Sequence, residues 1–177
     1  MAVRSIRRYG DPLLRKKAEP VKNITPEIQT LIEDMVETMY VALGIGLAAP
    51  QIGVSLRVIV VDEGGKGSTG PRGAFINPAI VAQMGSVRAE EGCLSLPGVY
   101  GDVIRAEWVR VEALDRQGAP VQIEARGLLA RVFQHELDHL DRLIFLDRLD
   151  KVQRDRIKRK IKREGLPESA PATALHL

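Results

Sequence analysis

The chain has 177 residues, of which 45% are hydrophobic and 28% are charged, and its formal net charge is +3. These values are typical of one soluble globular domain that is long enough to bury a hydrophobic core. Because no run of about 18 apolar residues occurs, we expect no membrane span. The basic first residues, 1–8, are not followed by the apolar segment of a secretory signal, so we expect a cytoplasmic protein.

Two helical segments are predicted near the N-terminus. Asp11 and a following proline suit the start of a short helical turn over residues 11–17. A longer helix is expected to begin after Thr25, which is followed by a proline and an acidic residue. Its apolar residues recur every three or four positions, and Gly44 ends it near residue 43. The methionines on its apolar face are expected to fill the core.

Residues 44–53 read Gly-Ile-Gly-Leu-Ala-Ala-Pro-Gln-Ile-Gly, a small apolar segment with one amide side chain, Gln51. One interpretation is a buried turn. The other is a backbone that closely approaches a ligand, which glycine permits, with Gln51 directed at that ligand. The segment alone favours neither interpretation.

Short strands are predicted in the middle of the chain. Five are expected, at residues 55–62, 74–83, 85–89, 103–114 and 121–125. Residues 115–118, Asp-Arg-Gln-Gly, are expected to join the last two as a hairpin. The glycine-rich residues 63–73 predict a flexible loop, to which we assign no function.

The single cysteine, Cys93, follows two acidic residues and a glycine and precedes a Leu-Ser pair. It cannot form an intrachain disulfide because the chain has no second cysteine. A small buried hydrophobic side chain is the simplest interpretation. A metal ligand or a nucleophile is the alternative.

Residues 134–140, Gln-His-Glu-Leu-Asp-His-Leu, contain the pattern H-E-x-x-H on a helix expected to begin at Gly127. In a helix, His135 and His139 lie one turn apart on one face and can bind one metal ion, while Glu136 can act as general base. The helix is apolar nearly all round before His135, which predicts a buried position. Buried histidines need partners, which favours a metal site over a surface helix that carries two histidines.

A catalytic metal usually has three protein ligands, so one more is needed. The longer zinc-protease motif would require a histidine where the chain has Phe145. The downstream glutamates Glu164 and Glu168 lie in a basic or disordered segment. Cys93 is therefore the candidate, and a Cys-His-His set suits Zn²⁺ or Fe²⁺.

Three segments together resemble peptide deformylase. They are Gly-Ile-Gly-Leu-Ala-Ala-Pro-Gln at 44–51, Glu-Gly-Cys-Leu-Ser at 91–95 and Gln-His-Glu-Leu-Asp-His at 134–139. The resemblance covers the chain to about residue 163. It implies an α+β fold of short mixed or antiparallel strands around a central metal-binding helix. It also implies hydrolytic removal of the formyl group from the N-terminal formylmethionine of nascent polypeptides, with release of formate.

The resemblance implies roles for the site residues as well. Cys93, His135 and His139 are expected to hold one divalent metal ion, Fe²⁺ in the family, with Zn²⁺, Ni²⁺ or Co²⁺ as alternatives. The expected catalytic groups are the Glu136 carboxylate as general base and, as oxyanion donors, the Gln51 amide and the Leu94 backbone N–H.

The substrate is expected to bind as an added β-strand. The residues expected to contact it are Ile45, Gly46, Gly92, Leu128 and Val132. Arg131 is expected to form a pocket wall with its charge outside. A buried Glu91 would need a partner, for which Arg105 is the candidate.

Positive charge is concentrated near the C-terminus. Residues 148–164 carry nine Lys or Arg and three acidic residues, a net charge of +6 that leaves −3 for the rest. They predict a basic helix over about 150–163 with a thin apolar stripe of Val152, Ile157 and Ile161. We expect one catalytic domain over residues 1–164, which includes this helix, and a disordered tail over 165–177.

The basic helix is either a solvated helix at the edge of the domain or a docking surface for the ribosome. Two other functions stay open from the sequence: a zinc endopeptidase of the H-E-x-x-H kind, and a non-catalytic metal module that binds ribosome or RNA. Neither a membrane nor a specific DNA sequence is an expected partner.

Overall fold

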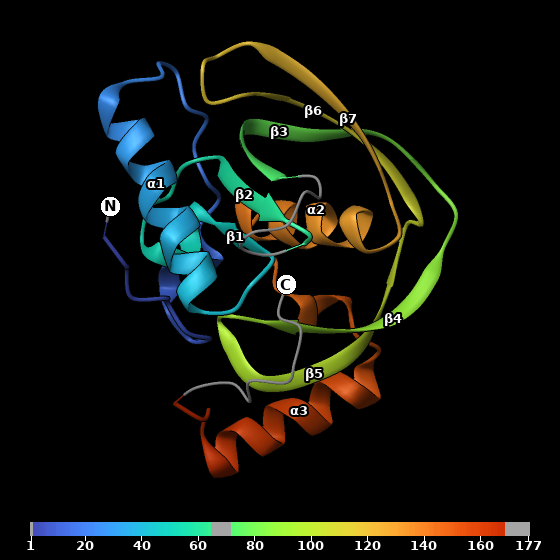
Figure 1. Ribbon diagram of the computed structural model, residues 1–177. Coiled ribbons are helices and arrows are strands. Elements are labelled where there is room, and N and C mark those ends of the chain that lie inside the picture. Colours follow the sequence, from blue (N-terminus) through green and yellow to red (C-terminus); the bar gives the residue numbers. More distant parts are fainter. Residues whose placement is uncertain (1, 65–71, 169–177) are drawn as a thin grey trace.

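The structure is a computed structural model and describes residues 2–64 and 72–168 (Figure 1). The loop expected at 63–73 and the tail expected at 165–177 lie largely outside the described residues. In the described part, none of the helices is long and apolar enough to cross a membrane.

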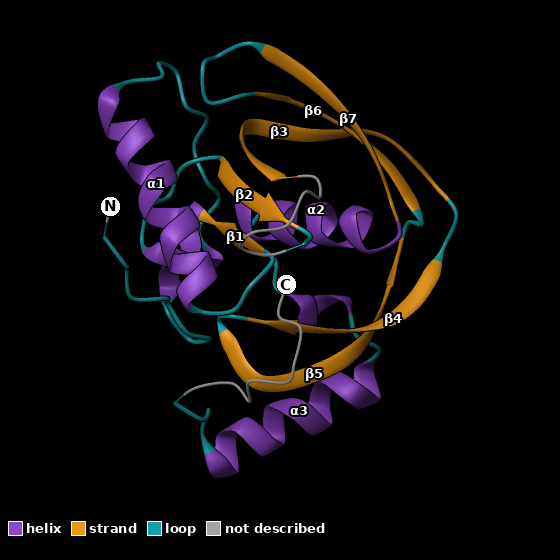
Figure 2. Ribbon diagram, in the orientation of Figure 1, coloured by secondary structure: helices purple, strands orange, loops and turns teal. Residues whose placement is uncertain are grey.

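Within residues 2–64 and 72–168, seven strands form two antiparallel sheets, and the helices lie between and beside them (Figures 1 and 2). The helices are α1 (Pro26–Val41), α2 (Gly127–Leu140) and α3 (Lys151–Glu164), with 3₁₀ turns η1 (Pro12–Arg15), η2 (Ala49–Ile52) and η3 (Phe145–Arg148). The strands are β1 (Gly46–Ala48), β2 (Val58–Asp62), β3 (Arg72–Met84), β4 (Val87–Cys93), β5 (Leu96–Arg105), β6 (Trp108–Leu114) and β7 (Pro120–Arg126).

The larger sheet has the strand order β1-β2-β3-β6-β7, and the smaller sheet consists of β4 and β5. Figure 1 shows α2 in the middle of the molecule, with strands of both sheets curving around it. The α+β prediction, with antiparallel strands around a central helix, is confirmed. The hairpin between β6 and β7 is confirmed too: the Asp115 side chain accepts hydrogen bonds from the backbone N–H groups of Gln117 and Ala119.

The single strand predicted at 103–114 is wrong, because the structure divides it into β5 and β6, which belong to different sheets. The chain changes sheets at Ala106, where the Gln134 side chain of α2 binds both the backbone N–H and the backbone C=O. Both strands have one buried face, so the alternating pattern continues across the break. The strand predicted at 85–89 also runs further, as far as Cys93.

The hydrophobic core has three parts. The first packs α2 against the larger sheet, with Phe133 and Val132 among its buried members. The second packs α1 against β1–β3 and contains the methionines Met35 and Met39, as predicted. The third packs β4 and β5 against η3 and α3 and includes Phe145. Burying each such side chain contributes about 1.5–3 kcal/mol, so α2 is held firmly between the two sheets.

Helix α3 lies along the outer side of β5, at the edge of the molecule (Figure 1). Its predicted apolar stripe is only partly correct: Ile157 is buried and Ile161 packs beside it, but Val152 is 78% exposed. The Asp150 side chain accepts a hydrogen bond from the Gln153 backbone N–H and caps the helix.

Candidate metal site

Helix α2 places the two predicted histidine ligands inside the molecule. His135 and His139 are each 1% exposed, and Glu136 between them is fully buried. Their rings are adjacent on the helix, with centroids 5.0 Å apart. This agrees with the one-turn separation expected from the H-E-x-x-H spacing.

The third predicted ligand arrives from the smaller sheet. The donor atoms of Cys93, His135 and His139 all lie within 4.8 Å of one another, and the Cys93 Sγ is 3.3 Å from the His139 Nε2. The His135 Nε2 is buried and has no hydrogen-bond partner among the described residues. One thiol and two imidazoles form a donor set that suits a borderline or soft divalent cation, so these residues fit a bound metal ion.

The surroundings of His139 and Cys93 shift the pKa values of these two ligands in opposite directions. Burial lowers the pKa of His139, and the charges of His135 and Arg105 add to this effect, so the imidazole is neutral and able to ligate. Burial raises the pKa of the Cys93 thiol, and Glu136 and Glu91 raise it further. A cation bound beside the sulfur supplies the charge that would stabilise its thiolate form.

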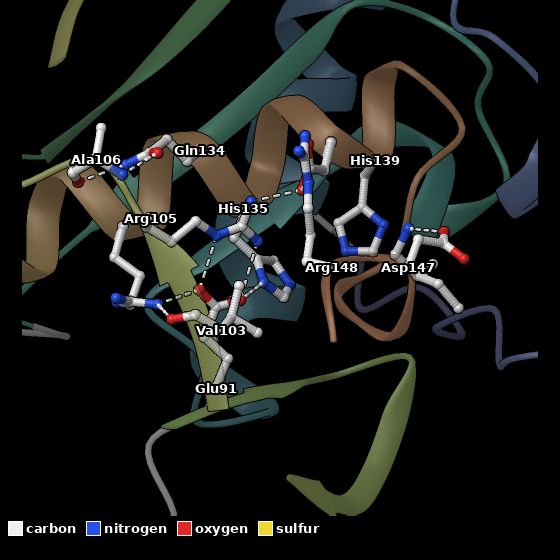
Figure 3. Close-up of polar contacts among 12 residues, drawn as sticks. Glu91, Val103, Arg105, Ala106, Gln134, His135, His139, Asp147 and Arg148 are labelled. Atoms are coloured by element: carbon white, nitrogen blue, oxygen red, sulfur yellow. Dashed lines mark hydrogen bonds and ion pairs between the residues drawn. The ribbon is translucent and has the colours of Figure 1, made fainter. Parts of the chain in front are cut away.

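The ring of His135 is oriented by a buried carboxylate. The His135 Nδ1 is 3.0 Å from the Glu91 Oε2 (Figure 3). Burial alone would raise the pKa of Glu91, but hydrogen bonds and charges from His135 and Arg105 lower it well below its usual value. The carboxylate is therefore ionised and holds the proton of His135 on Nδ1, which leaves Nε2 free for the metal.

The expected pair between Glu91 and Arg105 is confirmed, with two hydrogen bonds of 2.8 and 3.0 Å. Arg105 also donates to Asp138 of α2 at 2.6 Å, and Asp138 accepts from Arg148. Glu91, Arg105, Asp138 and Arg148 thus form a series of alternating charge behind His135. No sequence pattern indicated the extension of the Glu91–Arg105 pair to Asp138 and Arg148, because these residues come from α2 and η3.

The expectation for Arg131 is wrong. Its side chain is 8% exposed, and its guanidinium points inward, where it donates to the Glu91 Oε1 at 2.7 Å. The charge is not outside the domain, because a buried carboxylate and two backbone carbonyl groups bind it more favourably than the surface would.

Phe145 is a site residue that sequence reasoning missed. Its ring stacks on the ring of His135 with centroids 6.4 Å apart and an interplanar angle of 24°. Phe145 belongs to η3, beyond α2, and is 1% exposed. The only sequence feature that points to this stacking is the presence of an aromatic residue shortly after the second histidine ligand.

Gln51 contacts Cys93 through its side-chain amide. Its Nε2 donates to the Cys93 Sγ at 3.6 Å and to the Ser95 Oγ at 3.3 Å, while its Oε1 accepts from the Ala48 backbone N–H at 2.8 Å. The amide is therefore oriented, with its NH₂ group toward the metal ligands. Leu94 follows Cys93 at the turn between β4 and β5. Their roles as oxyanion donors stay predictions.

The glycine-rich segment 44–53 is both buried and in close contact with the site. A Cβ atom on Gly46 would lie 3.0 Å from the Glu136 Cδ and 2.9 Å from the Val132 Cγ1, and would overlap the Glu136 Oε1. The glycine thus permits a close approach, and the neighbour it approaches is the Glu136 carboxylate. Burial raises the pKa of that carboxyl group well above its usual value, and the negative charge of Glu91 adds to the effect. Neither Glu136 oxygen has a hydrogen-bond partner among the described residues.

The other residues expected to contact a peptide differ in their exposure. Ile45 and Val132 are buried, and Leu128 is 38% exposed at the start of α2. Gly92 precedes the cysteine ligand on β4 and is buried. Their contact with a substrate stays a prediction.

Comparison with known proteins agrees with the geometry of the site. Residues 3–155 match the family described as polypeptide deformylase. The chain belongs to this family. It is 49% identical to the peptide deformylase of Alkalilimnicola ehrlichii over 163 residues, which cover 92% of this chain and 91% of that protein. It is 52% identical to the peptide deformylase of Halothermothrix orenii over 158 residues, with coverage of 89% and 100%.

Solved structures of deformylases have the same fold. The peptide deformylase of Legionella pneumophila matches with a TM-score of 0.86 and 48% identity, covering 92% of this chain and 95% of that one. The enzyme of Thermus thermophilus matches with a TM-score of 0.85, 47% identity and the same coverage. The solved structures thus confirm the α+β fold, and the family match confirms that the chain belongs to a family of metal-dependent hydrolases.

Proposed function

We propose that this chain is a metal-dependent hydrolase that removes the formyl group from the N-terminal formylmethionine of nascent polypeptides and releases formate. The observation that carries the proposal is the buried set of Cys93, His135 and His139 beside the unpartnered carboxylate of Glu136. Membership of the deformylase family supports the same reaction. The substrate is made during protein synthesis, so a cytoplasmic place of action follows from the proposal.

The three ligands would hold one divalent ion, and the proposed native ion is Fe²⁺, with Zn²⁺, Ni²⁺ or Co²⁺ as alternatives. When bound, such an ion would act as a Lewis acid and lower the pKa of water. The donor set supports a borderline or soft ion. Metal analysis of protein purified without oxygen identifies the native ion.

Glu136 moves the proton in the proposed reaction. Its carboxylate accepts a proton from the attacking water and later delivers it to the amine nitrogen that leaves the formyl carbon. A raised pKa makes the Glu136 carboxylate a stronger base, and a bound cation would favour its ionised form before it takes up the proton. Burial also keeps bulk water away from the carboxylate.

The developing negative charge on the formyl oxygen would be stabilised by the Gln51 amide and the Leu94 backbone N–H. The bond from Gln51 Oε1 to the Ala48 backbone fixes the amide before substrate binds, so little reorganisation is needed. The peptide would add as a strand along Ile45, Gly46 and Gly92. The methionine side chain would enter an apolar site lined by the residues Ile45, Leu128 and Val132.

We also propose that α3 docks the enzyme on the ribosome through phosphate or acidic groups. A cleft of about 810 Å³ between α3 and β5 is lined by basic residues of the helix, among them Arg156, Arg159, Lys160 and Arg163. Such contacts weaken as salt increases. Co-sedimentation with ribosomes at low salt tests the proposal.

The informative variant in that experiment is the double reversal of exposed charges, Arg159→Glu with Lys162→Glu. The matched control reverses two exposed charges elsewhere, Lys16→Glu with Lys17→Glu. We expect the first pair to release the enzyme from ribosomes and the second to leave it bound. Equal binding of both would remove the docking role from α3.

The reaction itself is tested with formyl-Met-Ala-Ser and the unformylated peptide. We expect formate to be released from the first and neither internal peptide bond to be cleaved. Cleavage of an internal bond without formate would indicate the zinc endopeptidase instead. If metal-loaded protein hydrolyses neither peptide, the proposed reaction is excluded and the non-catalytic metal module is the remaining interpretation.

A further inference from the structure

The connection between the two sheets at the metal site depends on side chains. Cys93 comes from the smaller sheet, whereas His135 and His139 come from α2, which packs against the larger sheet. In the described part of the chain, no backbone ladder joins the two sheets. The relative position of β4 and α2 therefore has to be fixed by side chains for the three ligands to meet.

Glu91 is two residues before Cys93 on β4 and accepts hydrogen bonds from three side chains. The Arg105 guanidinium donates to both oxygens from β5. From α2, Arg131 donates to Oε1 at 2.7 Å, and the Nδ1 of His135 lies 3.0 Å from Oε2. Because Arg131 and His135 are four residues apart, they are on one face of the helix. The helix thus binds the carboxylate at both oxygens.

Arg131 also binds the backbone of both strands of the smaller sheet. One of its nitrogens donates to the Val103 carbonyl of β5 at 3.0 Å, and another donates to the Val87 carbonyl of β4 at 2.8 Å. One guanidinium therefore joins α2, β4 and β5. Its planar, forked donors can satisfy the three acceptors at once, which the single ammonium group of a lysine cannot do in the same directions.

We propose that Arg131 is a positioning residue that sets α2 against β4, so that His135 and Cys93 are preformed for the metal. It acts through Glu91 and contacts neither the metal ligand set nor the peptide directly. The inference rests on the proposed metal site and not on the identity of the substrate. It differs from the pocket-wall role expected from the sequence, because the group that acts is the buried guanidinium.

The variant Arg131→Met tests the inference, because it keeps most of the aliphatic stem and removes the guanidinium. Glu91 retains both bonds from Arg105, so the fold is expected to survive. Protein loaded with Zn²⁺ or Co²⁺ is mixed with excess chelator, and the rate of metal release is followed. We expect release about 10- to 100-fold faster than from the wild-type protein, because the loss of outer partners of metal ligands typically lowers metal affinity by that factor. The absorption bands of the Co²⁺ protein are expected to shift.

Steady-state kinetics distinguish a positioning role of Arg131 from a role in lining the substrate pocket. We expect Arg131→Met to lower kcat for formyl-Met-Ala-Ser. KM is expected to change by less than about twofold, because a positioning residue makes no contact with the bound substrate. A raised KM with unchanged metal release would overturn the inference. The control is Arg110→Met, which removes an exposed arginine paired with Glu124 on the larger sheet and is expected to leave release unchanged.

Two further variants complete the test. Within a Glu91→Gln background, Arg131→Met is expected to add less than about twofold to the release rate, because its route through the carboxylate is already lost. A full additional effect would show that Arg131 does not act through Glu91.

If Arg131→Met does not fold, Arg131→Lys takes its place. We expect the lysine variant to release metal at least about threefold faster than the wild-type protein. Release at the wild-type rate would show that the forked guanidinium is not needed, which would overturn the inference. Failure of the wild-type protein to bind Zn²⁺ would instead overturn the proposed metal site.

Discussion

Replacing Gly46 by alanine tests whether the glycine-rich segment is required for the position of the general base. The added Cβ would lie 3.0 Å from the Glu136 Cδ and 2.9 Å from the Val132 Cγ1. Carbon atoms in ordinary contact are about 3.5–4.0 Å apart. Either the carboxylate or strand β1 must therefore shift by about 0.5–1 Å.

A shift of this size is costly at a reacting centre. Misplacement by about 1 Å can lower the rate by about 100-fold, which corresponds to about 2.7 kcal/mol in the activation free energy. We therefore expect Gly46→Ala to lower kcat/KM for formyl-Met-Ala-Ser by about 30- to 100-fold. The bound metal is expected to remain, because the three atoms nearest to the new methyl group belong to Glu136 and Val132 and not to a proposed ligand.

The matched control is Gly44→Ala in the same segment. Its Cβ would lie 2.7 Å from the Leu94 Cδ1, the end of a flexible side chain that can rotate away without moving the Leu94 backbone N–H, the proposed oxyanion donor. We expect kcat/KM within about threefold of the wild-type value. Formate release is measured on metal-saturated protein, with metal content and Tm as checks. A Gly46→Ala enzyme as active as the control would refute the reasoning, as would loss of the metal from it.

Three other predictions concern the site and its support. Glu136→Ala is expected to retain the metal and to lower kcat by about 10²- to 10⁴-fold; loss of the ion on metal analysis would show that Glu136 supports the metal instead. Cys93→Ser is expected to weaken metal retention or to change which metal is bound, and unaltered metal content and activity would place the third ligand elsewhere. Asp147 supports η3, because it accepts hydrogen bonds from the Arg15 side chain and the Ile144 backbone N–H. Burial alone would raise its pKa, but these bonds lower it. Its contribution to stability is therefore fully present above the unfolded pKa of about 3.9 and is lost as pH falls from there through the lowered pKa of the folded state. Asp147→Asn should therefore lower the free energy of unfolding at pH 7 by more than at a pH of about 3.5 in urea titrations, and an equal difference at both would contradict the assignment.

The sequence predicted most helices and strands because their patterns are local. The apolar spacing of α1, the β-branched run of β2 and the Asp-Arg-Gln-Gly turn between β6 and β7 each depend on a few neighbouring residues. The break between β5 and β6 was missed because it depends on Gln134 of a distant helix, which binds the backbone at Ala106.

The ligand residues of the site were predictable for a similar reason. His135, Glu136 and His139 lie within one helical turn, and Cys93 is the single thiol of the chain. Spacing and elimination were sufficient to select them as candidates, and the structure brings the three ligands together.

What surrounds the ligands was decided only by the tertiary structure. Arg131 was expected to keep its charge at the surface because a long cationic side chain is usually solvated. It is buried because Glu91, a carboxylate from another strand, and two strand carbonyls offer it three acceptors. The stacking of Phe145 on His135 likewise needs the chain to turn back after α2. Sequence alone thus determined which groups can bind a metal, and only the packing of two sheets around α2 decided how those groups are oriented.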